Sequence, residues 1–142
     1  MSTDAHFDCE AAMARLPEAW AFVERFCAQH GIDPRDALRL NLLVEELFTN
    51  TVVHGRGGDS DTPVRMELRA DAARLTLVFA DMAPPFDPLA WRDEGPGTVP
   101  AALEDRPVGQ LGIRLVAKMA ARADYERSGG WNRLRLELDR QS

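Results

Sequence analysis

Residues 46–55 read ELFTNTVVHG, and this stretch decides the fold because its polar residues recur at helical spacing. Glu46, Asn50 and His54 are four residues apart, so a helix places them in one row along its side. Beside this row runs an apolar stripe made of Leu40, Leu43, Val44 and Leu47. The row therefore lies at the rim of a buried face, where its side chains either meet solvent or point into a cleft.

The surrounding N-terminal half of the chain predicts two helices. In residues 11–30 apolar positions recur at helical spacing, and Gly31 ends this pattern. Asp33 followed by Pro34 is typical of an N-cap with proline at the first helical position. The second helix is therefore expected to run from Pro34 to about His54, where a group of glycines begins.

The remaining segments predict strands around one long loop. Alternating or apolar patterns occupy residues 6–10, 64–69, 74–80, 123–127 and 132–138, and the SGG of residues 128–130 predicts a tight hairpin turn. Proline and glycine are dense between residues 81 and 107, whereas residues 109–121 have one apolar face and predict a third helix. This order favours an α+β two-layer sandwich, with a mixed, mostly antiparallel sheet and helices on one face.

Length and charge narrow the class of protein. The chain has 142 residues, so we expect one domain over residues 1–142. Lys and Arg number 17 against 23 Asp and Glu, and the net charge of −6 argues against nucleic acid as a partner. No apolar run approaches the roughly 18 residues that span a bilayer. The polar start lacks the features of a signal peptide, so a cytoplasmic protein without membrane contact is expected.

Three segments contain residues suited to chemistry. Asn50 offers an amide oxygen to a hard cation such as Mg²⁺, and Glu46, one turn away, could order or deprotonate a nucleophile. Asp81 follows an apolar strand, where its carboxylate could accept from an exocyclic amine such as that of adenine; the alternative is a proline-rich turn with acidic caps. Residues 109–113 (GQLGI) open a helix, which suits phosphate but also describes an ordinary helix entry.

Together and in this order, the three segments resemble the GHKL ATP-binding superfamily, which includes histidine kinases, gyrase and Hsp90-type chaperones. Residues 46–55 resemble its N box, and the segments at Asp81 and at 109–112 stand where its two glycine boxes belong. The PFDP of residues 85–88 and the stretch 104–116 resemble the bacterial anti-sigma-factor serine kinase branch. These are the stand-alone ATPase domains of partner-switching pathways.

The resemblance implies roles for individual residues. Asn50 would ligate Mg²⁺, Glu46 would be the catalytic residue acting on an acceptor serine, and Asp81 would read the adenine amino group. Residues 89–108 would form a lid over the phosphates. The remaining ATP contacts implied are His54, Ala83, Phe86, Gly109, Leu111, Gly112 and Asn132.

The resemblance also implies a function and partners. A serine/threonine kinase of this branch phosphorylates a STAS-type anti-sigma-factor antagonist, sequesters a sigma factor or another output protein, and shares its pathway with a PP2C-type phosphatase; a homodimer is implied as well. Ala83 and Gln110 stand where glycines are frequent, and Asn132 stands near a frequent threonine or serine. These departures motivate the alternative, a catalytically weak or inactive binding module of the same fold that sequesters a protein partner. A histidine-kinase fragment is disfavoured, because no phosphoacceptor helix fits before the first strand.

One competing motif concerns zinc. His6 and Cys9 form an H-x2-C pair, and Cys27 and His30 form a C-x2-H pair, which gives four candidate ligands. Cys27, however, falls on the apolar face of the first predicted helix, where a free cysteine usually behaves as a small hydrophobic residue. A zinc site is therefore disfavoured, and both cysteines are expected to be reduced.

Overall fold

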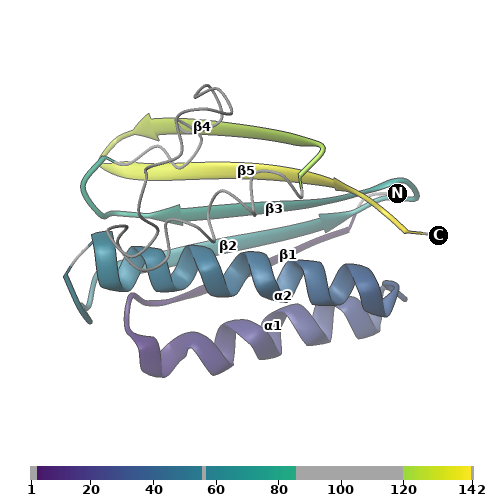
Figure 1. Cartoon of the computed structure of the whole chain (residues 1–142), viewed down its shortest axis with the longest axis horizontal. Coiled ribbons are helices and arrows are strands. Elements are labelled where there is room, and N and C mark those ends of the chain that lie inside the picture. Colours follow the sequence, from purple (N-terminus) through teal and green to yellow (C-terminus); the bar gives the residue numbers. More distant parts are fainter. Residues whose placement is uncertain (1–2, 56, 86–119, 142) are drawn as a thin grey trace, which may run out of the picture.

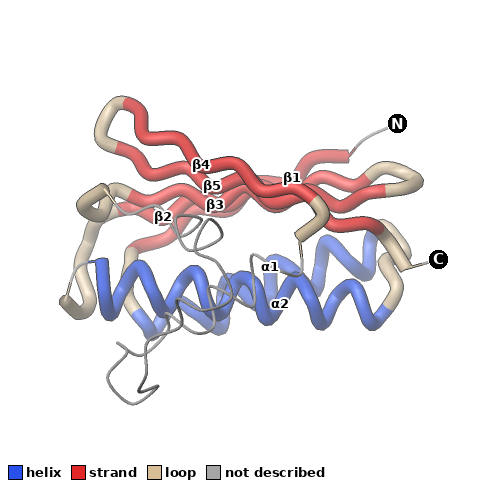
Figure 2. Tube along the Cα trace, turned by 45° about the horizontal axis from the view of Figure 1, so that its top comes forward, coloured by secondary structure: helices blue, strands red, loops and turns tan. Residues whose placement is uncertain are grey.

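The computed structural model describes residues 3–55, 57–85 and 120–141, which form two layers (Figure 1). One layer is a sheet with the strand order β1-β2-β3-β5-β4, in which every described pair is antiparallel. Its strands are β1 (Thr3–Glu10), β2 (Pro63–Ala70), β3 (Arg74–Asp81), β4 (Arg122–Ser128) and β5 (Trp131–Asp139). The helices α1 (Leu16–Gln29) and α2 (Pro34–Thr49) cover one face of the sheet, as Figure 2 shows. The predicted α+β sandwich is confirmed, whereas the third predicted helix at 109–121 lies outside the described residues.

Local signals in the sequence set the helix boundaries. The short 3₁₀-helix η1 (Met13–Arg15) precedes α1, so the α-helix begins later than residue 11. Gly31 follows α1 with φ of +60°, a left-handed conformation that glycine adopts without strain. Asp33 caps α2, because its Oδ1 accepts a hydrogen bond of 2.8 Å from the Arg35 amide.

The end of α2 differs from the sequence prediction. The α-helix stops at Thr49, and the chain continues as one wider π-helical turn, η2 (Asn50–Gly55). A π-helix closes its hydrogen bonds over five residues instead of four, so the regular row of Glu46, Asn50 and His54 does not continue past Asn50. The prediction of an α-helix up to His54 was therefore wrong, and the side chain of His54 lies outside the described residues.

The core lies between the helices and the sheet. Strand β5 alternates, and Asn132, Leu134, Leu136 and Leu138 face the helices while the residues between them are exposed or half-buried. The largest side chains with less than 2% exposure are Phe26, Phe48, Leu40, Leu43, Met66, Leu68, Leu75, Leu77, Leu136 and Leu138. Each contributes about 1.5–3 kcal/mol on burial, so the two layers are held together mainly by this apolar contact.

A buried carboxylate ties the start of α2 to the end of β5. Asp36 has no exposed surface, and its Oδ1 accepts a 3.0 Å hydrogen bond from Arg39 Nη1. Its Oδ2 accepts a 2.8 Å hydrogen bond from the Gln141 amide, and Arg39 also donates to the Asp139 carbonyl oxygen. These contacts anchor α2, the helix that carries Glu46, against the sheet.

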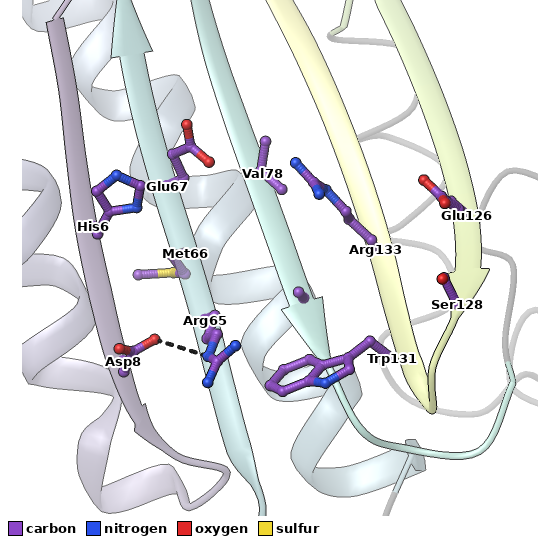
Figure 3. Close-up of a pocket in the computed structure, with 11 residues that line it drawn as sticks. His6, Asp8, Arg65, Met66, Glu67, Val78, Glu126, Ser128, Trp131 and Arg133 are labelled. Carbon is purple, nitrogen blue, oxygen red and sulfur yellow. Dashed lines mark ion pairs between the residues drawn. The ribbon is translucent and has the colours of Figure 1, made fainter.

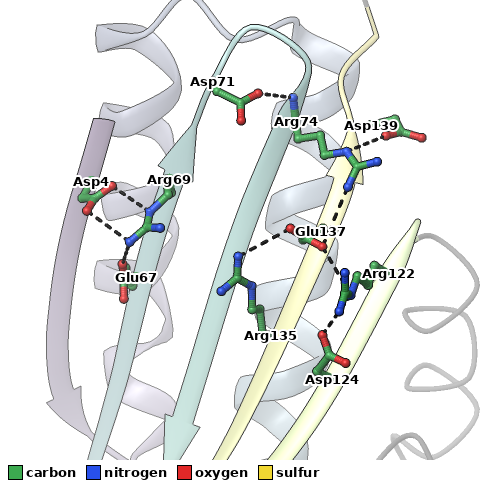
Figure 4. Close-up of polar contacts among 10 residues, drawn as sticks. All are labelled: Asp4, Glu67, Arg69, Asp71, Arg74, Arg122, Asp124, Arg135, Glu137 and Asp139. Carbon is green, nitrogen blue, oxygen red and sulfur yellow. Dashed lines mark hydrogen bonds and ion pairs between the residues drawn. The ribbon is translucent and has the colours of Figure 1, made fainter. Parts of the chain in front are cut away.

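The other face of the sheet is polar and lined by ion pairs between neighbouring strands (Figure 4). Arg69 on β2 contacts Asp4 on β1 at 2.9 Å, and Arg122 on β4 approaches Glu137 on β5 at 3.8 Å. Exposed pairs of this kind contribute about 0–1 kcal/mol each. Their value here is that charged residues alternate with the apolar ones, which fixes the face that each strand turns to the core.

The residues of the candidate zinc motif do not come together. His6 lies on the polar face of β1, whereas Cys9, three residues on, packs on the core side. Burial raises the pKa of the Cys27 thiol to about 11, which opposes the thiolate form that binds metals. Within residues 3–55, 57–85 and 120–141, no three His, Cys, Asp or Glu side chains are grouped to hold a metal ion. None of the helices there is long and apolar enough to cross a membrane.

Candidate functional site

The helix layer and the sheet each contribute to the candidate site. Glu46 lies on α2 and Asn50 at the start of η2, while Asp81 ends β3 and Asn132 lies near the start of β5. Ala83 follows two residues after Asp81. The other predicted residues lie outside the described part of the chain: Phe86, Gly109, Leu111, Gly112 and the lid at 89–108.

Asp81 is the centre of a buried hydrogen-bond network. It is 9% exposed, and the register of the sheet places it opposite Asn132. Its Oδ1 accepts from Asn132 Nδ2 at 2.9 Å and from the Ala83 amide at 3.0 Å. Its Oδ2 accepts from Thr51 Oγ1 at 2.7 Å. Donors from η2, β5 and the following turn thus fix the orientation of this carboxylate, as burial of such a polar group requires.

The hydrogen bonds within the described residues leave one acceptor position of Asp81 unused. A carboxylate has roughly four acceptor positions, and the three donors use three of them. The remaining position can accept one further hydrogen bond, such as that from an exocyclic amino group. A ring carbonyl in the same place would present a second acceptor and be repelled. The geometry therefore suits the reading of an amino-substituted base.

Thr51 is a member of the site that sequence reasoning missed. It is 4% exposed and immediately follows Asn50, yet it falls outside the row of residues spaced by four. Its hydroxyl joins η2 to Asp81 on β3. The sequence offered one hint of this role, namely a hydroxyl side chain within residues 46–55. It could not show that Asp81 is the partner of Thr51, because that contact depends on the π-helical turn.

Ala83 fits the turn after β3 without strain. No non-glycine residue in the described part of the chain has a positive φ, so this turn does not need glycine's conformational freedom. The Ala83 side chain is buried at 4% exposure while its amide caps Asp81. Alanine in place of the glycine that is frequent at this position in the resembling family is thus compatible with an ordered turn.

Asn50 contrasts with Asp81 because its buried oxygen is left unsatisfied. Oδ1 is inaccessible to solvent and has no hydrogen-bond partner within the described structure. An orphaned buried acceptor costs about 1–3 kcal/mol, and an amide oxygen is a suitable ligand for Mg²⁺. The residue therefore fits a metal bound with a nucleotide. Asn41 Oδ1 is also orphaned, but nine residues earlier it lies on about the opposite side of α2, away from this site.

Glu46 lies one turn before Asn50 and is half-buried. Partial burial, and then the charge of neighbouring Glu45, raise the pKa of its carboxyl above the usual range. A general base works best with a pKa closer to neutral pH than that of an ordinary glutamate. The environment of Glu46 thus suits proton acceptance from a hydroxyl group.

A hollow on the other face of the sheet does not contain these groups. It has a volume of about 550 Å³ and lies on the polar face of the sheet (Figure 3). Inside it Arg65 pairs with Asp8 at 3.4 Å and lies 4.6 Å from the centre of the Trp131 ring. Because these groups satisfy one another and none of the predicted residues is present, the candidate site remains the one at Asp81 and Asn50.

The fold is that of a two-layer α+β sandwich, with polar groups gathered between its helix layer and one end of strand β3. Residues 9–138 match the family of histidine kinase-like ATPase domains, HATPase_c_2, and the chain belongs to this family. The predicted relation to the GHKL superfamily is thereby confirmed, and family membership implies ATP as the ligand.

Solved structures confirm the fold. The chain is similar to the crystal structure of the RsbU and RsbW domains of Rv1364c from Mycobacterium tuberculosis, with a TM-score of 0.65 and 16% sequence identity. The alignment covers 99% of this chain and 34% of that one, so the present chain spans about a third of that protein. At this identity the likeness is one of fold. A comparison with the curated proteins found no match.

Proposed function

We propose that this domain binds ATP with Mg²⁺ and phosphorylates a serine or threonine of a STAS-type antagonist protein in a partner-switching pathway. The main observation behind this proposal is that two adjacent residues, Asn50 and Thr51, connect its two binding groups. Asn50 has a buried, unsatisfied oxygen, while Thr51 is bonded to Asp81. A metal-binding group and a base-reading group are thereby connected through one turn. Family membership and the fold shared with a structure that includes an RsbW domain support the same function.

The residues divide the work in this proposal. Asp81 accepts a hydrogen bond from the adenine amino group, and Asn50 Oδ1 ligates the metal. Mg²⁺ supplies charge neutralisation at the phosphates when it is bound. Glu46 accepts the proton of the acceptor hydroxyl as that oxygen bonds to the γ-phosphorus and the bond to the ADP oxygen breaks.

Other parts of the proposal concern residues and proteins beyond the described structure. Contacts from His54, Phe86, Gly109, Leu111 and Gly112 would complete the ATP site, with the lid at 89–108. A sigma factor or other output protein, a PP2C-type phosphatase and a second copy of the chain are the proposed partners. We propose a cytoplasmic location for this pathway.

The test is transfer of labelled phosphate from ATP to a purified STAS-domain antagonist protein. Wild-type protein is expected to label the antagonist, and Glu46→Ala is expected to abolish labelling while still binding ATP. Labelling that survives Glu46→Ala would contradict the role of Glu46. Binding of Mg-ATP without any transfer would favour the alternative, a sequestering module without kinase activity.

A further inference from the structure

Side chains of the β4–β5 hairpin hold the turn that follows Asp81. Arg127 Nη1 donates to the Ala83 carbonyl oxygen at 2.7 Å. Asn132 Nδ2 lies 3.0 Å from the same oxygen and 3.1 Å from the Pro84 carbonyl oxygen. The hairpin, 44 to 51 residues away in sequence, therefore contacts both the carboxylate and the backbone of the turn.

Tyr125 sets the orientation of Asn132. Its hydroxyl donates to Asn132 Oδ1, so the amide nitrogen of Asn132 faces Asp81 and the turn. Asn132 is 7% exposed, which leaves it little freedom to rotate. We call Tyr125, Arg127 and Asn132 the hairpin clasp.

Counting donors shows why Arg127 matters. The Asn132 amide has two N–H groups, whereas Asp81 Oδ1 and the carbonyl oxygens of Ala83 and Pro84 all lie within 3.1 Å of its nitrogen. Two hydrogens cannot bond fully to three acceptors. Arg127 supplies the missing donor to Ala83, so Asn132 can remain directed at Asp81.

We propose that Arg127 is a positioning residue: through the hairpin clasp it holds the turn at residues 82–84 and so fixes Asp81 for discrimination of the base. The inference rests on the proposed function, because it assumes that Asp81 reads an adenine amino group. Without Arg127, the amide of Asn132 is shared with the Ala83 carbonyl, and the orientation of Asp81 loosens. Loss of Arg127 therefore reduces the selectivity for the base more than it reduces binding of the metal and phosphates.

Strand β4 offers a matched control. Arg122 is five residues from Arg127, so it points to the opposite, polar face, where it contacts Asp124 at 3.3 Å. Replacing Arg122 removes the same charge from the same strand without touching the turn. Arg127→Lys tests rescue, since lysine retains a charged donor for one carbonyl oxygen.

The experiment measures the Kd of Mg-ATP and Mg-ITP for wild-type, Arg127→Ala, Arg127→Lys and Arg122→Ala proteins. ITP carries a ring carbonyl where ATP carries the amino group, so the ITP/ATP ratio of Kd reports base discrimination. We expect Arg127→Ala to lower this ratio roughly fivefold or more, the effect of about one hydrogen bond, with partial recovery in Arg127→Lys. Arg122→Ala should keep the wild-type ratio.

Hydrogen exchange of the Ala83 amide in nucleotide-free protein tests whether Arg127 holds the turn, separately from whether Asp81 reads the base. We expect faster exchange in Arg127→Ala and no change in Arg122→Ala. An unchanged ratio or unchanged exchange in Arg127→Ala would overturn the inference. Wild-type protein that binds no ATP would instead refute the proposed function and the claim about the base, while exchange would still decide whether Arg127 holds the turn.

Discussion

The two ends of the candidate site differ in how they satisfy their polar atoms. At the proposed base end, Asp81 receives hydrogen bonds from Thr51, Asn132 and the Ala83 amide. At the proposed metal end, Asn50 Oδ1 is buried without a partner in the described structure. The described residues thus satisfy the polar atoms of Asp81, whereas they leave the buried oxygen of Asn50 unsatisfied.

This difference has an energetic consequence. Hydrogen bonds at the base end stabilise the free protein, while the orphaned oxygen at the metal end costs stability that a bound cation can recover. Substitution of Thr51 should therefore lower the stability of the free protein more than substitution of the adjacent Asn50. Functional sites often retain groups of this kind because binding needs them.

The largest expected effect is on phosphoryl transfer. Replacing Glu46 with Gln removes the proposed base, so the rate of antagonist phosphorylation should fall by roughly 10²- to 10⁴-fold. ATP affinity should change little, because Glu46 is assigned to the hydroxyl and not to the nucleotide. Single-turnover transfer and equilibrium ATP binding measure the two quantities separately.

Glu45 provides the control for that substitution. Glu45→Gln removes a carboxylate from the adjacent position, and transfer should survive. Its charge contributes to the raised pKa of Glu46, so the acidic limb of the pH–rate profile should move to lower pH. An equal loss of activity in both variants would show that the effect is not specific to Glu46.

The next effect contrasts the stability of two neighbouring substitutions. Thr51→Val deprives Asp81 of a buried donor and should lower the free energy of unfolding by about 1–3 kcal/mol. Asn50→Ala removes an unsatisfied acceptor, and its cost should be under about 1 kcal/mol. Urea unfolding of nucleotide-free protein checks both. A larger loss in Asn50→Ala than in Thr51→Val would reverse the comparison.

The smallest effect is a pH dependence of stability at Glu46. Because the folded state raises the pKa of Glu46, folding favours its neutral form. Protonated Glu46 contributes fully to stability below roughly pH 4, which is about the pKa of a glutamate in the unfolded chain. This contribution is lost as the pH rises through the pKa of Glu46 in the folded protein. Glu46→Gln should therefore be slightly more stable than wild type near neutral pH and equal to it in acid. Thermal melts at both pH values test this, and a gain in acid alone would contradict it.

Most of the fold could be predicted because local patterns determine it. Alternation placed the strands near their observed bounds, and the SGG sequence predicted the hairpin turn, where Gly129 and Gly130 have φ of +57° and +86°. The cap at Asp33 and the stop at Gly31 marked the helix ends. The π-helical turn at 50–55 could not be predicted, since apolar periodicity does not distinguish a wider turn from the end of an α-helix.

The site was predicted less completely because its contacts depend on pairing between distant strands. The spacing of Glu46 and Asn50 is local and was found in the sequence. The network at Asp81 depends on the register between β3 and β5, which brings together residues 51 positions apart. Arg127 was missed for that reason, whereas Thr51 was missed because its contact with Asp81 depends on the π-helical turn.

The most direct measurement is a calorimetric titration of wild-type and Asn50→Ala proteins with ATP, each in the presence and absence of Mg²⁺. If Asn50 completes a metal site, wild-type protein should bind ATP at least about tenfold more tightly with Mg²⁺. Asn50→Ala should bind both forms with the same, weaker affinity. A full response to Mg²⁺ in Asn50→Ala, or no response in the wild type, would contradict the assignment of Asn50 as the metal ligand.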